Sequence, residues 1–150
     1  DHCRAFASQH YVRLQPRLLA SEETVDTQVN GDPILLRTML DNLVLNAVRF
    51  SPAGNTVEVN LFRSDSMVSI AVRDFGPGIP PERLATIFDR FSQAQEEQRR
   101  GRGHGLGLAI AQGIAELHGG SVSAENHPEV GCVFTARLPV LNGEGGTGDR

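Results

Sequence analysis

The chain has 150 residues, 39% of them hydrophobic and 21% charged, which is the size of one globular domain with a substantial core. A net charge of −4 and a pI near 5.7 argue against a nucleic-acid-binding surface or an acidic-membrane surface, because both need concentrated lysine and arginine. Cys3 and Cys132 match neither a disulfide framework nor a zinc-ligand spacing, which favours a reduced, cytoplasmic setting. No apolar run reaches the ~18 residues of a membrane span, so we expect any inner-membrane anchor of the parent protein to lie elsewhere.

The first third of the chain contains one clear helix signal. Residues 1–10 resemble a helix end, and residues 10–19 have an extended pattern. In "VNGDPILLRTMLDNLVLNAVRFSP", Asp32 suits an N-cap, Pro33 suits the first helical position, and apolar residues recur at helical spacing. Ser51 and Pro52 interrupt the pattern, so a long helix is predicted between Asp32 and Ser51.

The remaining elements alternate between strands and helices. Residues 56–64 and 67–75 alternate in polarity and predict an antiparallel hairpin. A short helical piece is predicted over residues 84–91, followed by a mobile polar loop over residues 92–105. Residues 106–120 predict a second long helix that ends at Gly119, and residues 121–126 and 131–140 predict a closing hairpin before a disordered tail.

Three polar residues share one face of the first long helix. Asn42, Asn46 and Arg49 are spaced i, i+4 and i+7, so they project from one narrow arc. An amide oxygen is a suitable ligand for Mg²⁺, and a guanidinium can meet phosphate oxygens. A solvated helix face is the alternative interpretation.

The hexapeptide "DFGPGI" follows a predicted strand. Gly76 and Gly78 allow close backbone approach, and Asp74 supplies an acceptor at the mouth of the sheet. A carboxylate beside apolar walls can accept a hydrogen bond from the exocyclic amine of adenine. An ordinary tight turn with a capping aspartate is the alternative.

The stretch "RRGRGHGLGLAI" is rich in glycine and opens the second long helix. A dinucleotide fingerprint needs a strand directly before its glycines, whereas "QAQEEQRR" has no strand character. A flexible linker does not turn at once into an apolar-periodic helix. The pattern therefore favours a phosphate-binding loop that runs into a helix N-terminus, where free amides and the helix dipole attract anions.

These pieces, in this order, resemble the catalytic, ATP-binding domain of sensor histidine kinases. "LDNLVLNAVRFSP" is similar to the N box, "DFGPGI" to the first glycine box, "IFDRF" to the phenylalanine box and "GHGLGLAIA" to the second glycine box. The ordered combination is far more specific than any single box. The resemblance implies a Bergerat-type α+β two-layer sandwich, in which a mixed, mainly antiparallel sheet packs against about three helices.

The resemblance also implies roles for individual residues around MgATP. Asn46 would bind Mg²⁺, Asn42 would lie beside the nucleotide, and Asp74 would bind the adenine amine. Arg49 and Phe50 stand where the family usually has lysine and tyrosine. The phenylalanine box would anchor a lid, and the second glycine box would line the triphosphate. The expected catalytic residues are Asn42, Asn46 and Arg49, and the other expected ATP-binding residues are Phe50, Asp74, Gly76, Gly78, Ile79, Phe88, Arg90, Phe91, Arg102, Gly103, His104, Gly105, Leu106, Gly107 and Leu108.

Two positions of this chain differ from those of related proteins in ways that bear on the expected catalysis. Related ATPases carry a glutamate that activates water one turn before the metal-binding asparagine, and here that position is Asn42, an amide that cannot act as a base. Asp41 is adjacent but points about 100° away around the helix. The family often has an arginine after the phenylalanine box that reaches the γ-phosphate, whereas this chain has Gln93.

We therefore expect a protein-histidine kinase fragment without its own phosphoacceptor histidine, since no histidine of the chain stands in a phosphoacceptor motif. Residues 1–24 would be the end of a linker and a first strand region, 25–140 the catalytic core and 141–150 a flexible tail. The expected partners are a helical dimerisation domain of the same kinase and a response-regulator receiver domain, with no nucleic acid and no direct membrane contact. The alternative is a regulatory nucleotide-binding module without transfer activity, either a degenerate sensor or an anti-sigma-type regulator.

Overall fold

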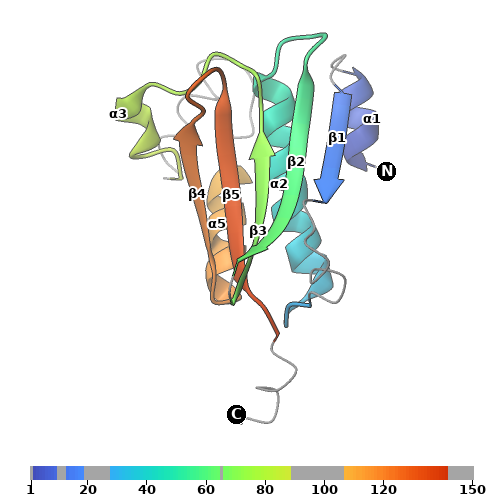
Figure 1. The fold of residues 1–150 in the computed structure, drawn as a ribbon, viewed down its shortest axis with the longest axis vertical. Coiled ribbons are helices and arrows are strands. Elements are labelled where there is room, and N and C mark those ends of the chain that lie inside the picture. The colour runs from blue at the N-terminus through green and yellow to red at the C-terminus, as the bar shows by residue number, and fades with distance from the viewer. Residues whose placement is uncertain (1, 10–12, 19–27, 65, 89–106, 142–150) are drawn as a thin grey trace.

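A sheet forms one layer of the fold (Figure 1). The computed structural model describes residues 2–9, 13–18, 28–64, 66–88 and 107–141, and within them the sheet has five strands in the order β1-β2-β3-β5-β4. Strand β1 pairs in parallel with β2, and the other neighbouring strands are antiparallel. This confirms the expected mixed, mainly antiparallel sheet. The strands are β1 (Arg13–Leu18), β2 (Thr56–Ser64), β3 (Met67–Arg73), β4 (Ser121–Asn126) and β5 (Cys132–Pro139).

Helices form the second layer. The long helix α2 (Pro33–Phe50) and α5 (Gly107–Leu117) contact each other and lie behind the sheet in Figure 1. Helix α1 (His2–Gln9) packs beside α2 and β1, and α3 (Pro81–Leu84) lies at one end of the sheet. Within the described residues no helix is long and apolar enough to cross a membrane.

The core lies between the two layers. Alternate residues of β3 and β5 are buried and meet as cross-strand pairs, as a half-buried sheet requires. They pack against the buried face of α2, which includes Met39, Leu43 and Ala47, and against Leu108 and Ala111 of α5. The buried cross-strand pairs are Val68 with Leu138, Ile70 with Ala136 and Val72 with Phe134.

The helix ends follow the predicted signals. The Asp32 side chain caps α2 by accepting hydrogen bonds from the backbone N–H groups of Ile34 and Leu35. Helix α5 ends where Gly119 adopts a left-handed φ of 79° and Gly120 N–H bonds to the Ala115 carbonyl. Both ends agree with the sequence prediction.

The short helix near the first glycine box was misplaced by the sequence prediction. Helix α3 spans Pro81–Leu84, not residues 84–91, because proline suits the first helical position. After Leu84 the N–H groups of Ala85 and Thr86 both bond to the Arg83 carbonyl, which closes shorter rings than an α-helix needs. Residues 85–88 form turns, and residues 89–91, the expected mobile loop and residues 142–150 of the expected tail lie outside the described residues.

Candidate functional site

The polar arc of α2 forms as the helical spacing predicted. Asn42, Asn46 and Arg49 are half-buried, whereas Leu43 and Ala47 on the other side of the helix are buried in the core. The Asn46 side-chain nitrogen is buried and has no hydrogen-bond partner among the described residues. Since an unpartnered buried polar group costs about 1–3 kcal/mol, this amide fits a ligand that supplies the missing partner.

The N-terminus of α5 meets this arc. A Cβ atom added to Gly107 would lie 3.8 Å from the side-chain oxygen of Asn42, so the first turn of α5 lies beside the polar face of α2. The first N–H groups of a helix have no intrahelical partners and attract anions. Two motifs that lie about sixty positions apart in the sequence are therefore neighbours in space.

The lid residues that the resemblance named lie mostly outside the described residues. Phe88 is the last described residue before the gap, and it is half-buried against the core. Leu108, just after the gap, is buried in the core. The predicted site residues outside the described residues are Arg90, Phe91, Arg102, Gly103, His104, Gly105 and Leu106.

Asp74 lies directly after β3, where its side chain is 2% exposed. One carboxylate oxygen, Oδ1, accepts hydrogen bonds from the backbone N–H groups of Gly76, at 2.9 Å, and Cys132, at 3.3 Å. Oδ2 has no hydrogen-bond partner among the described residues. Burial raises the pKa of Asp74, although these two bonds and the charge of Arg73 oppose the rise. The aspartate therefore caps a tight turn with one oxygen, and the other oxygen has no hydrogen-bond partner among the described residues.

Close backbone approaches shape the loop after Asp74. A Cβ on Gly76 would collide with the carbonyl oxygen of Phe50 at the end of α2. A Cβ on Gly131 would collide with the carbonyl oxygen of Asp74, and Gly131 has a left-handed φ of 86°. Gly78 also has a left-handed φ, of 82°. Glycine is required where backbones pack this closely, so the loop is held between α2 and the β4–β5 turn.

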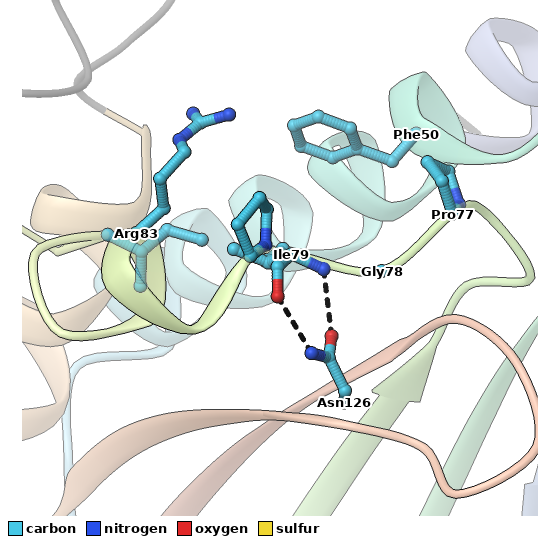
Figure 2. A pocket seen from close by; sticks show the side chains of 8 residues that line it. Phe50, Pro77, Gly78, Ile79, Arg83 and Asn126 are labelled. Carbon is cyan, nitrogen blue, oxygen red and sulfur yellow. Dashed lines mark hydrogen bonds between the residues drawn. The ribbon is translucent and has the colours of Figure 1, made fainter.

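A pocket of about 450 Å³ is lined by residues of this loop (Figure 2). The ring of Phe50 and the side chain of Arg83 lie on opposite sides of it, above Ile79. The predicted site residues Phe50, Gly78 and Ile79 line this pocket, but Asp74, Asn42 and Asn46 do not. Its lining residues are Phe50, Pro77, Gly78, Ile79, Pro80, Arg83, Ile87 and Asn126.

The carboxylate nearest to Asn42 in the sequence is already engaged. The Cys3 thiol donates a hydrogen bond to Asp41 Oδ1 at 3.1 Å, and Arg37 Nε lies 4.0 Å from Asp41 Oδ2. Burial and the neighbouring carboxylate raise the pKa of the Cys3 thiol to about 12. Asp41 therefore contacts α1 and its own helix, on a side of α2 away from the polar arc.

Sequence reasoning missed the contribution of the β4–β5 hairpin. Cys132 donates its backbone N–H to Asp74, and the Asn126 side chain bonds to both the N–H and the carbonyl of Ile79. The pKa of the Cys132 thiol is raised to about 12, first by burial and then by the nearby charge of Asp74. No spacing signal links residues 126–132 to residues 74–79, because the link exists only once the strands pair.

The donor atoms of α2 fit Mg²⁺ better than a transition metal. Within the described residues, no group of three or more His, Cys, Asp or Glu side chains could hold a metal ion. Mg²⁺ prefers oxygen ligands, takes few from the protein and keeps several from water and phosphates. Rotation of the Asn46 amide exchanges its nitrogen and oxygen, so the buried, unpartnered position can present an oxygen.

Comparison with known proteins identifies the family. The family model described as "Histidine kinase-, DNA gyrase B-, and HSP90-like ATPase" matches residues 31–142. The chain belongs to this ATPase family. Over 108 residues this ATPase-family domain is 48% identical to Signal transduction histidine-protein kinase AfsQ2 of Streptomyces coelicolor, a match that covers 72% of the chain and 20% of that protein. Over 115 residues it is 41% identical to Sensor-like histidine kinase SenX3 of Mycobacterium tuberculosis, which covers 76% of the chain and 28% of that protein.

Solved structures agree with this family. A mycobacterial sensor histidine kinase, MprB, superposes with a TM-score of 0.77 at 28% identity, over 93% of this chain and 87% of that one. Full-length ShkA in complex with AMPPNP superposes with a TM-score of 0.72 at 27% identity, over 93% of this chain and 29% of that one. The expected fold is confirmed. The matched region is 20% of the length of AfsQ2 and 28% of the length of SenX3, so the chain spans less than a third of either kinase.

Proposed function

We propose that this domain binds MgATP and presents the γ-phosphoryl group to a histidine on a separate helical domain of a sensor kinase. The phosphoryl group would then pass to an aspartate of a response-regulator receiver domain. The relatives named above are sensor histidine kinases, and one similar structure holds AMPPNP. The observation that carries the proposal is the position of Asp41: its carboxylate contacts Cys3 and Arg37, so neither it nor Asn42 is placed to activate water.

The base of the nucleotide belongs at Asp74. Its Oδ2 has no partner among the described residues and lies in a low-polarity setting, so it suits the amino group of adenine. Gly76 permits close approach of the loop to α2, and Ile79 supplies a buried apolar wall. Phe50 stands beside the same loop and offers an aromatic face for stacking.

The phosphates belong between α2 and the first turn of α5. Asn42 faces Gly107 across this space, and the free N–H groups of α5 favour an anion. Asn46 would hold Mg²⁺, which when bound neutralises charge on the phosphate oxygens. Arg49, one turn further along α2, would contact phosphate through its guanidinium. The lid roles of Phe88, Arg90, Phe91, Arg102, Gly103, His104, Gly105 and Leu106 complete the proposed site.

Phosphoryl transfer with this set of residues relies on positioning and charge. The amides of Asn42 and Asn46 hold the nucleotide without activating water, which suits a nucleophile that a second domain provides. A regulatory module that binds nucleotide without transfer is the second candidate, because Gln93 replaces the arginine that the family often has there. We further propose that the domain works in the cytoplasm and that the parent protein is anchored in the inner membrane.

The test combines binding with transfer. Calorimetry with MgATP measures affinity, and incubation with γ-labelled ATP and the separately purified dimerisation hairpin of the parent kinase measures transfer to histidine. We expect Asp74→Asn to lose binding and transfer together, since it replaces the acceptor that faces the amine with an amide. Asp41→Asn is the matched control, because the amide oxygen can still accept the hydrogen bond from Cys3.

Each result separates the candidates. Tight MgATP binding with histidine labelling supports the kinase. Binding without labelling supports the regulatory module. Unchanged affinity in Asp74→Asn overturns the placement of adenine at this residue.

A further inference from the structure

The loop from Asp74 to Pro80 has few hydrogen-bond donors of its own. Pro77 and Pro80 lack a backbone N–H. Gly78 adopts a left-handed conformation and, as a glycine, has no side chain that could pack against the rest of the fold. Gly76 N–H is already bonded to Asp74. The Ile79 end of the loop therefore depends on a partner outside it.

Asn126 supplies that partner. Its Oδ1 accepts a hydrogen bond from Ile79 N–H at 2.8 Å, and its Nδ2 donates to the Ile79 carbonyl at 2.7 Å (Figure 2). The side-chain amide thus bonds to both polar groups of one residue, as a neighbouring strand would. Both distances lie at the short end of the range for N–H···O hydrogen bonds in proteins.

The turn that follows Asn126 is held by its own hydrogen bonds. Asn126 ends β4 opposite Cys132, and the turn between them is closed by a hydrogen bond from His127 N–H to the Gly131 carbonyl at 2.8 Å. In the same turn, Glu129 N–H donates to His127 Nδ1 at 3.1 Å. A rotamer change of Asn126 would break two hydrogen bonds without releasing the turn.

The same hairpin end also fixes the other end of the loop. Cys132 N–H bonds to Asp74 Oδ1, Asp74 N–H bonds to the Cys132 carbonyl, and Arg73 donates to the Val130 carbonyl. The turn thus sets the separation between the carboxylate of Asp74 and the buried side chain of Ile79. These are the two groups that the proposed adenine site requires.

We propose that Asn126 is a positioning residue for the nucleotide base. It acts through Ile79, by holding that apolar wall of the proposed adenine site at a fixed distance from Asp74, and it does not itself contact the reacting phosphates. This inference rests on the proposed function, because it assigns a role within the same site. It adds a determinant that lies some fifty positions from the first glycine box in the sequence.

Two substitutions of Asn126 distinguish positioning from general stability. Asn126→Ala removes both hydrogen bonds to Ile79. Asn126→Asp keeps the shape but, when ionised, offers only acceptors and repels the Ile79 carbonyl. A protonated carboxyl group has one donor and one acceptor, so acid restores both bonds in Asn126→Asp and cannot do so in Asn126→Ala.

The measurement is the Kd for MgADP by calorimetry from about pH 8 to about pH 4, where an ordinary aspartate begins to protonate, expressed as the ratio of variant to wild type at each pH. At the higher pH both variants should bind about tenfold more weakly, which corresponds to about 1.4 kcal/mol. On acidification the ratio for Asn126→Asp should fall toward one, while the ratio for Asn126→Ala stays constant. Melting temperatures of the same samples separate lost folding from lost positioning.

Other charged groups lie near Asn126. The ratio of variant Kd to wild-type Kd and a control variant both account for their effect on binding. The charged and titratable groups near Asn126 and its turn are Arg73, Asp74, Arg83, Glu125, His127 and Glu129, and all of them are present in both variant and wild type. Asn60→Asp adds the same carboxyl group to β2, which β3 and β5 separate from β4. It should bind MgADP like the wild type at every pH.

The outcomes separate this inference from the proposed function. If the wild type binds no MgADP, the proposed function fails and the inference with it. If the wild type binds and Asn126→Ala binds equally well, the proposed function stands and the positioning role is wrong. Wild-type affinity in Asn126→Asp at about pH 8, where the added carboxyl group is ionised, also overturns the positioning role.

Discussion

Asp74, the residue proposed to bind adenine, is buried at a cost to stability. Its carboxylate is buried, and two backbone N–H groups compensate only part of the lost hydration, so its pKa is raised. The folded domain therefore binds this proton more readily than the unfolded chain does. As pH rises through the window between the unfolded and the folded pKa, the contribution of Asp74 to stability falls. Ionisation of this carboxyl group in the folded domain therefore costs stability, and protonation restores it.

Asp74→Asn should therefore separate binding from stability. Its amide oxygen can still accept from Gly76 and Cys132, and no buried charge remains, so the melting temperature near neutral pH should equal or exceed that of the wild type. Affinity for MgATP should fall by about ten- to a hundredfold, because a hydrogen bond to a charged group is lost. The stability difference should shrink on acidification. Thermal scans across pH check this, and an Asp74→Asn variant that melts well below the wild type at neutral pH would contradict it.

At the scale of elements, local signals predicted most of the fold. Asp32 and Pro33 defined the start of α2, and the alternation of β3 and β5 defined their buried faces. The misplaced helix α3 shows the limit, because apolar spacing over residues 84–91 outweighed the proline signal at Pro81. Residue type and spacing predicted Asn42, Asn46 and Asp74 as site residues. Asn126 was not, since its role depends on a hydrogen bond across 47 positions that only strand pairing creates.

Two glycines, one within α5 and one after its C-terminal end, should respond differently to alanine. Gly113 is an exposed position within the helix with nothing within 4 Å of an added Cβ, so Gly113→Ala should stabilise the domain by about 0.5–1 kcal/mol. At Gly120, after the helix end, a Cβ would collide with the backbone carbonyl of Arg137 in β5. Gly120→Ala should cost about 2 kcal/mol or more. Urea denaturation measures the free energy of unfolding of both variants. A similar change at the two positions would contradict the close packing of Gly120 against Arg137.

At the scale of the whole domain, the candidate site joins both layers and both halves of the chain. Asn42 and Asn46 come from α2, Asp74 from the end of β3, Gly107 from α5, and the β4–β5 turn supports the loop between them. An unfolded chain cannot bring these groups together. A nucleotide that binds here therefore binds the folded state alone, and its binding energy adds to the free energy of unfolding.

This linkage gives a test of Mg²⁺ and Asn46. Free MgATP at a hundred times its Kd should raise the free energy of unfolding by about 2.7 kcal/mol. Chelation of Mg²⁺ with EDTA should remove most of that gain in the wild type. Asn46→Ala should remain folded, since it deletes an amide with no partner for its nitrogen among the described residues, and its smaller gain should not change with EDTA. A metal-dependent gain in Asn46→Ala equal to that of the wild type would exclude Asn46 as a ligand.

The two buried thiols offer a way to watch different parts of the domain open. Cys3 is enclosed between α1 and α2, and Cys132 lies under Asp74 at the base of the β4–β5 turn. Burial raises both thiol pKa values to about 12, so neither reacts appreciably with an alkylating reagent while the domain is closed. The rate of Cys132 labelling then measures how often the β4–β5 turn separates from the loop between Asp74 and Pro80. The rate of Cys3 labelling measures how often α1 separates from α2. Bound nucleotide should slow the labelling of Cys132 more than the labelling of Cys3. The two cysteines, unreactive in the folded domain, therefore report on local opening in two different places.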